Sequence, residues 1–102
     1  MADKAFAPYT QAAAVVNKDG SVVRSKAVTE VKKVGKGDYR IIVDADIPLG
    51  RAVPIATLNR SAHWGSEIYV KTTDTSGSDH TFQVLTGVDG AASDQPFHVI
   101  VP

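Results

Sequence analysis

The stretch GKGDYRIIVDADIPLG, residues 35–50, decides the fold class of this chain. After the glycines, every second residue is a large apolar one (Tyr39, Ile41 and Val43), which is the two-residue period of a β-strand. We therefore predict a strand from Tyr39 to Asp44. Ile42, between Arg40 and Asp44 on the second face, favours a strand partly covered on both sides, as in two packed sheets.

The segment before this strand predicts a hairpin and a second strand. AAAVV (12–16) and SVVR (21–24) are separated by Asn17–Gly20, whose Asn, Asp and Gly residues favour a tight turn. Residues 28–33 carry valines at a spacing of three, which suits a helix. Because the valines are β-branched and Gly35 follows at once, we predict a strand that contains a bulge.

The segments after residue 50 also read as strands between turns. Pro54 lacks an amide donor, so the strand that contains it is expected at a sheet edge or a bulge. Residues 67–73 and 81–86 flank DTSGSDH and predict a second hairpin, GVDGAASDQ (87–95) reads as a loop, and PFHVIV (96–101) reads as the last strand. The sequence thus predicts an all-β fold, an antiparallel β-sandwich or small barrel of about seven or eight short strands.

Length and composition limit the organisation of the protein. A chain of 102 residues with 43% hydrophobic and 22% charged residues is one soluble domain, 1–102, in which residues 1–11 are expected to be a flexible N-terminal arm. It contains no cysteine and no apolar run of membrane-spanning length, and because no long apolar run follows Lys4 we expect no signal peptide. The default expectation is therefore a cytoplasmic protein, with export by another route as the alternative.

The charges are unevenly distributed. Residues 1–36 carry seven Lys or Arg against three acids, giving +4, and residues 37–102 carry four against eight, giving −4. A basic patch for an anionic partner is one interpretation. We prefer the other, in which the halves pack together and neutralise each other across neighbouring strands. Because no aromatic residues alternate with the lysines, no nucleic-acid partner is expected.

Metal sites and catalytic motifs are weakly supported. Asp74, Ser76 and Asp79 could supply oxygen ligands to calcium, but their spacing equally suits a polar turn, which we prefer. The spacing of His63, His80 and His98 does not indicate a zinc site, and His98 is expected to be partly buried beside Ile100. No nucleophile elbow or phosphate-binding loop is found, so we expect no cofactor and no enzyme activity.

The best binding candidate is the loop NRSAHWG, Asn59–Gly65. Arg60, His63 and Trp64 together would offer an aromatic plate with polar donors, a combination used to bind sugars and protein partners. The alternative, which we prefer for a domain with one Trp, is that Trp64 folds back as the main core aromatic. A glycan-binding role therefore depends on an exposed indole.

Three segments together resemble a small bacterial β-rich domain of unknown function. The residues that carry the likeness are VVNKDGSVVRSKAVTEVKKVGKGDYRIIVDADI (15–47), EIYVKTTDTSGSDHTFQV (67–84) and DQPFHVIV (94–101). That domain occurs alone or at the ends of secreted, surface or fibre-like proteins, and its two common cysteines are absent here. The resemblance implies a displayed, self-associating or immunogenic β module without catalytic residues.

These observations give two expectations for function. The first is a non-enzymatic structural or protein-interaction module, such as a surface-exposed antigen, that contacts a protein partner or itself. Self-association is expected at exposed edges, either the strand with Pro54 or the terminal strand. The alternative is a carbohydrate-binding, lectin-like module that uses the Asn59–Gly65 loop.

Overall fold

The computed structural model describes residues 10–49, 52–72 and 80–102. In this part of the chain it contains no helix and nine strands, which are β1 Ala12–Val16, β2 Val22–Lys26, β3 Val28–Gly35, β4 Asp38–Val43, β5 Ile55–Leu58, β6 Ser66–Lys71, β7 Thr81–Val88, β8 Ala91–Ala92 and β9 Phe97–Val101. The all-β prediction is confirmed. The count exceeds the expected seven or eight because the loop at 87–95 contains the two-residue strand β8, which pairs with the end of β7.

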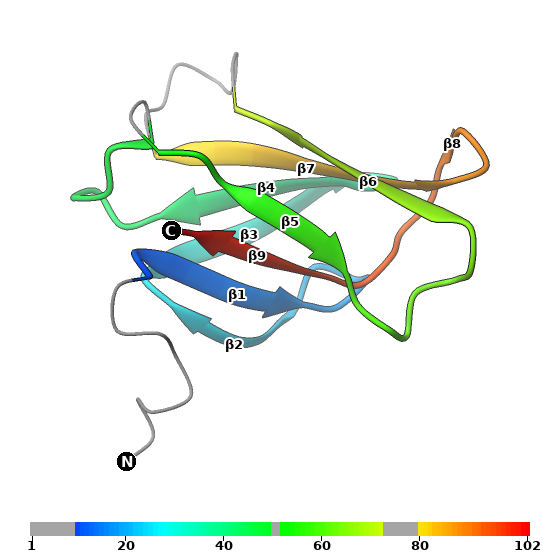
Figure 1. Cartoon of the computed structure of the whole chain (residues 1–102), viewed down its shortest axis with the longest axis horizontal. Coiled ribbons are helices and arrows are strands. Elements are labelled where there is room, and N and C mark those ends of the chain that lie inside the picture. Colours follow the sequence, from blue (N-terminus) through cyan, green and yellow to red (C-terminus); the bar gives the residue numbers. More distant parts are fainter. Residues whose placement is uncertain (1–9, 50–51, 73–79) are drawn as a thin grey trace.

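The strands form two antiparallel sheets that pack face to face as a sandwich (Figure 1). One sheet has the order β2-β1-β9-β5, and the other has the order β3-β4-β7-β6 with β8 added to β7. The predicted hairpins β1–β2 and β6–β7 are both present. In β3, the pairing register with β4 shifts between Val28 and Glu30, so the predicted bulge is confirmed.

The core lies between the two central strands of one sheet, β1 and β9, and the two central strands of the other, β4 and β7. Tyr39, Ile41 and Val43 all face inward from β4, as their alternation predicts. The Tyr39 ring meets Phe97 of the opposite sheet edge-on, with ring centroids 4.8 Å apart and planes at 67°. The largest fully buried side chains are Tyr39, Phe82, Phe97, Ile41, Val16, Val84 and Val101. Each such side chain contributes about 1.5–3 kcal/mol through burial.

The terminal strand is not an edge, contrary to expectation. β9 pairs with β1 on one side and with β5 on the other. Its backbone amides and carbonyls are therefore already used in the sheet, and only β2 and β5 end this sheet. Pro54 immediately precedes β5. Because β5 is the last strand of this sheet, the predicted edge position of the strand near Pro54 is confirmed.

Residues 10 and 11, which the sequence assigns to an N-terminal arm, lie against the sandwich. Thr10 is 8% exposed, and the backbone N–H of Gln11 donates to the carbonyl of Val101 at 2.9 Å. The Gln11–Val101 hydrogen bond extends the β1–β9 pairing by one step. Residues 1–9 of the predicted arm lie outside the described part of the chain. Over the described ranges, no helix has the length and apolar character that a membrane crossing needs.

Candidate functional site: a polar cleft beside an exposed tryptophan

Three connecting segments meet at one end of the sandwich and line a cleft of about 700 Å³. These segments are the β1–β2 turn, the β5–β6 loop and the stretch between β8 and β9; the loop and this stretch lie at the right in Figure 1. The lining residues are mostly polar: Asn17, Lys18, Asp19, Ser61, His63, Asp94, Gln95 and Pro96. One wall of the cleft is thus the β1–β2 turn, whose residues the sequence identified only as a turn.

Hydrogen bonds within the β1–β2 turn hold Asp19 in place. Its Oδ1 accepts from the backbone N–H of Ser21 at 2.9 Å and from the Ser21 hydroxyl at 2.6 Å. These bonds favour the ionised form and lower the pKa of Asp19 below its usual value. Gly20 has a φ of 92°, which its lack of a Cβ allows. The turn therefore presents a fixed carboxylate at neutral pH.

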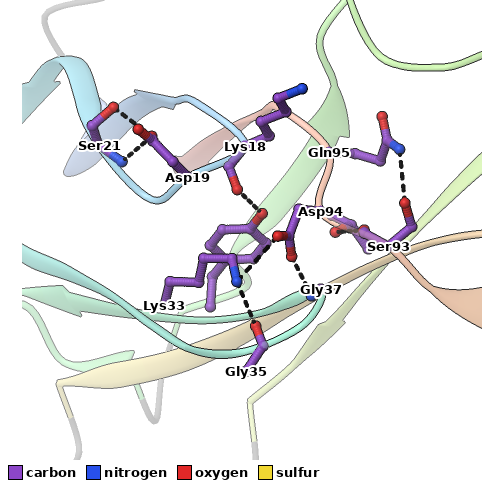
Figure 2. A network of polar contacts seen from close by, with 11 residues as sticks. Lys18, Asp19, Ser21, Lys33, Gly35, Gly37, Ser93, Asp94 and Gln95 are labelled. Carbon is purple, nitrogen blue, oxygen red and sulfur yellow. Dashed lines mark hydrogen bonds and ion pairs between the residues drawn. The ribbon is translucent and has the colours of Figure 1, made fainter.

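Asp94 connects the segment before β9 to the β3–β4 turn (Figure 2). Its Oδ1 accepts from the Gly37 backbone N–H at 2.6 Å, and its Oδ2 lies 3.1 Å from Lys33 Nζ. Desolvation raises the pKa of Asp94, but the Gly37 hydrogen bond and the positive charges of Lys33 and Lys36 outweigh it, so the pKa is lowered overall. The Lys33–Asp94 pair joins one basic residue of the first 36 to one acidic residue of the remaining chain.

The β5–β6 loop forms the opposite wall and is held by several hydrogen bonds, among them one from the Asn59 backbone N–H to the Pro96 carbonyl at 3.0 Å. Asn59 Oδ1 accepts from the backbone N–H and the hydroxyl of Ser61, both at 3.1 Å. Farther along, the His63 backbone N–H donates to Gln95 Oε1 at 3.0 Å. Because Gln95 belongs to the segment before β9, this contact attaches the loop to the rest of the cleft.

Trp64 is not a core residue, contrary to the preferred expectation. Its side chain is 93% exposed, and Arg60 and His63 are exposed as well. The core position is already filled by Tyr39, Phe82 and Phe97, all of them fully buried. The fold brings His63 into the cleft lining, whereas Arg60 and Trp64 are on the same loop but do not line the cleft.

The remaining candidates lie elsewhere. Asp74, Ser76 and Asp79 fall outside the described residues. His98 is exposed on the outer face of its sheet, so its expected partial burial is wrong. The side chains of β9 that point inward are those of Phe97, Val99 and Val101. Ile100 shares that outer face with His98, as predicted. Among the described residues, no group of three His, Asp or Glu side chains is placed to hold a metal.

Sequence reasoning missed most of the cleft. Asn17, Lys18 and Asp19 were identified only as a turn, and Asp94 and Gln95 only as a loop. Polar residues beside Gly or Pro are visible in the sequence as a local signal. The sequence does not show that the β1–β2 turn and the segment before β9 lie close together, because this depends on β9 pairing with β1 across eighty or more intervening residues.

Comparison of the chain with protein-family models, with curated proteins and with solved structures found no match. The chemical capacity of the site is therefore the basis for any functional argument. The cleft offers the imidazole of His63, Lys18 and the fixed Asp19 carboxylate, and the next residue after His63, Trp64, presents an exposed indole outside the lining. Such a set suits binding of a polar or amphipathic surface.

Proposed function

We propose that this protein is a non-enzymatic interaction module whose contact surface is the β5–β6 loop, with Trp64 as its anchor. The observation that carries this proposal is the 93% exposure of Trp64. A tryptophan buries about 150–250 Å² in a contact. At ~25 cal/mol per Å², covering it would give a gross hydrophobic gain of about 4–6 kcal/mol, which offsets part of the entropic cost of association. The resemblance to displayed bacterial domains extends the proposal to a surface-exposed module, such as an antigen.

The loop that carries Trp64 is fixed before any partner arrives. Asn59 bonds Ser61 at its beginning, and His63 bonds Gln95 immediately before Trp64. A preorganised loop loses less conformational entropy on binding than a mobile one. Arg60 and His63 add polar groups around the indole, the usual surroundings of an interface anchor. A protein partner, including a second copy of this chain, is the occupant we propose.

The two carboxylates near the cleft, Asp19 and Asp94, do not supply a general acid. Asp94 is held by Gly37 and Lys33, and Asp19 is held by Ser21. Both pKa values are lowered, so neither group carries a proton to donate near neutral pH. General acid catalysis instead needs a carboxyl whose pKa is raised toward the working pH.

Carbohydrate binding is the second candidate, and the cleft favours it. Asn17, Asp19, His63 and Gln95 provide the planar polar groups that bind sugar hydroxyls, and Trp64 is on the adjoining loop. In this case the indole would stack on a sugar face. The glycan would have to extend from the cleft to Trp64, which lies outside the cleft lining.

Sedimentation velocity over a wide concentration range tests the second-copy form of the proposal. We expect association that weakens at least tenfold in Trp64→Ala but not in Tyr69→Ala, because Tyr69 is a large, 59% exposed aromatic that lies on β6 and not in this loop. A monomer at all concentrations would reject self-association. Titration of Trp64 fluorescence with a panel of defined glycans tests the second candidate, and saturable changes lost in Asp19→Ala would favour it.

A further inference from the structure

The amide of Asn59 has a defined orientation. Its Oδ1 accepts two hydrogen bonds from Ser61, one from the backbone N–H and one from the hydroxyl. Its Nδ2 must therefore face the other way, and it lies 3.0 Å from His98 Nε2. Exchanging the two amide atoms would place an NH₂ group against the Ser61 N–H, which is two donors facing each other.

This orientation fixes the state of the His98 ring. An amide NH₂ only donates, so His98 Nε2 must accept, and an imidazole nitrogen accepts only when it carries no proton. The Asn59 hydrogen bond therefore requires a His98 ring that carries no proton on Nε2. Histidine is also the side chain whose charge ordinarily changes between pH 5 and 8. A proton added at Nε2 would face the Asn59 amide donor.

We propose that His98 is a proton-sensitive support for the Trp64 loop, so that protonation releases Asn59 and weakens binding at that loop. This inference rests on the proposed function of the loop. When His98 is protonated, Asn59 keeps its bonds to Ser61 and loses His98, or turns toward His98 and loses Ser61. Either outcome removes one of the contacts that hold the start of the loop.

The surroundings of His98 leave the Asn59 contact as the main polar restraint on its ring. On the outer face of the sheet, its cross-strand neighbours are Val15 on β1 and Thr57 on β5. The adjoining groove of about 300 Å³ is lined by uncharged residues apart from His98 itself. The nearest titratable groups on the same sheet are Arg24 and Lys26 of β2, which pair with Val15 and Ala13, and the loop that begins at Asn59 carries Arg60 and His63.

Nuclear magnetic resonance of the free protein between pH 4.5 and 8 tests this proposal without a ligand. We expect the Ser61 amide and the Trp64 indole N–H to shift with the same midpoint as the His98 ring. His98→Gln keeps an acceptor that does not titrate, so the shifts that follow the His98 midpoint should disappear. His63→Gln, the matched control in the same loop, should retain them. Loss of one hydrogen bond corresponds to about fivefold weaker Trp64-dependent binding in acid.

The outcomes are separable. Shifts that persist in His98→Gln, vanish in His63→Gln or are absent in the native chain would overturn the proton-sensitive support. Because these measurements use no partner, they remain valid if Trp64 binds nothing. Conversely, ligand binding at pH 8 that stays Trp64-dependent would uphold the proposed function even if the His98 proposal fails.

Discussion

The Tyr39 hydroxyl, on β4 of one sheet, donates a hydrogen bond of 2.5 Å to the backbone carbonyl of Lys18, in the turn of the other sheet. Tyr39 is fully buried, and its ring also meets Phe97 across the core. One side chain thus connects the hydrophobic core to a wall of the cleft. The shape of the cleft therefore depends on the packing of the two sheets.

Tyr39→Phe should lower the free energy of unfolding by about 1–2 kcal/mol, because it removes the bond to Lys18 but keeps the ring. Urea denaturation measures this change. Tyr69→Phe is the control, because its hydroxyl makes only an exposed contact of 3.3 Å with Glu67 and should change stability by less than about 0.5 kcal/mol. Equal effects of the two substitutions would contradict a special role for Tyr39.

Stability should fall at high pH through Tyr39. Burial, followed by the negative charge of Asp94, raises the pKa of Tyr39 to about 12 from 10.0. The neutral hydroxyl is favoured in the folded state, so its contribution is complete below pH 10 and is lost as pH rises toward 12. Urea denaturation of the native chain and Tyr39→Phe at several pH values between 8 and 12 tests this. The two curves should converge, and a constant difference would argue against it.

Asp94→Ala should destabilise the protein by about 1–3 kcal/mol, because the Gly37 amide loses its acceptor and Lys33 its partner. Asp94→Asn should cost less, since its Oδ1 still accepts from Gly37. The lowered pKa of Asp94 means that its ionic contribution is present above the ordinary pKa of 3.8 and is lost as pH falls below it. Thermal unfolding at pH 7 and pH 2.5 measures both effects. Exposed Asp46→Ala is the control.

Gly37→Ala should be more destabilising than Gly90→Ala. Both glycines have positive φ, 65° and 83°. A Cβ on Gly37 would lie 2.3 Å from the Thr86 carbonyl oxygen, whereas a Cβ on Gly90 would meet nothing within 4 Å. We expect about 1 kcal/mol for Gly90→Ala and roughly 2–4 kcal/mol for Gly37→Ala. Similar denaturation midpoints for both variants would show that the β3–β4 turn can move away.

Trp64→Ala should change the free energy of unfolding by less than about 0.5 kcal/mol, because the exposed Trp64 side chain makes few contacts in the folded state that the substitution would remove. Phe97→Ala, in the core, should cost about 3–5 kcal/mol. Acrylamide should quench Trp64 almost as well in the folded protein as in urea. A protected, blue-shifted indole would contradict the exposure on which the proposed function rests.

The strands could be predicted because their signals are local. The alternation of Tyr39, Ile41 and Val43 identified the inward face of β4, and Asn17–Gly20 identified the first turn. Two-residue periodicity and turn chemistry depend on neighbours in sequence. For the same reason, the edge position of the strand after Pro54 was predictable from its missing amide donor.

The sequence alone therefore determined an all-β chain, its main hairpins and the faces of its strands, since each follows from nearby residues. Only the tertiary structure decided that β9 lies in the middle of a sheet, that Phe97 rather than Trp64 fills the core, and that Asp19, His63 and Asp94 line one cleft. These features depend on which distant strands pair. Apolar side chains compete for a limited core volume, and the outcome of that competition is set by the whole chain.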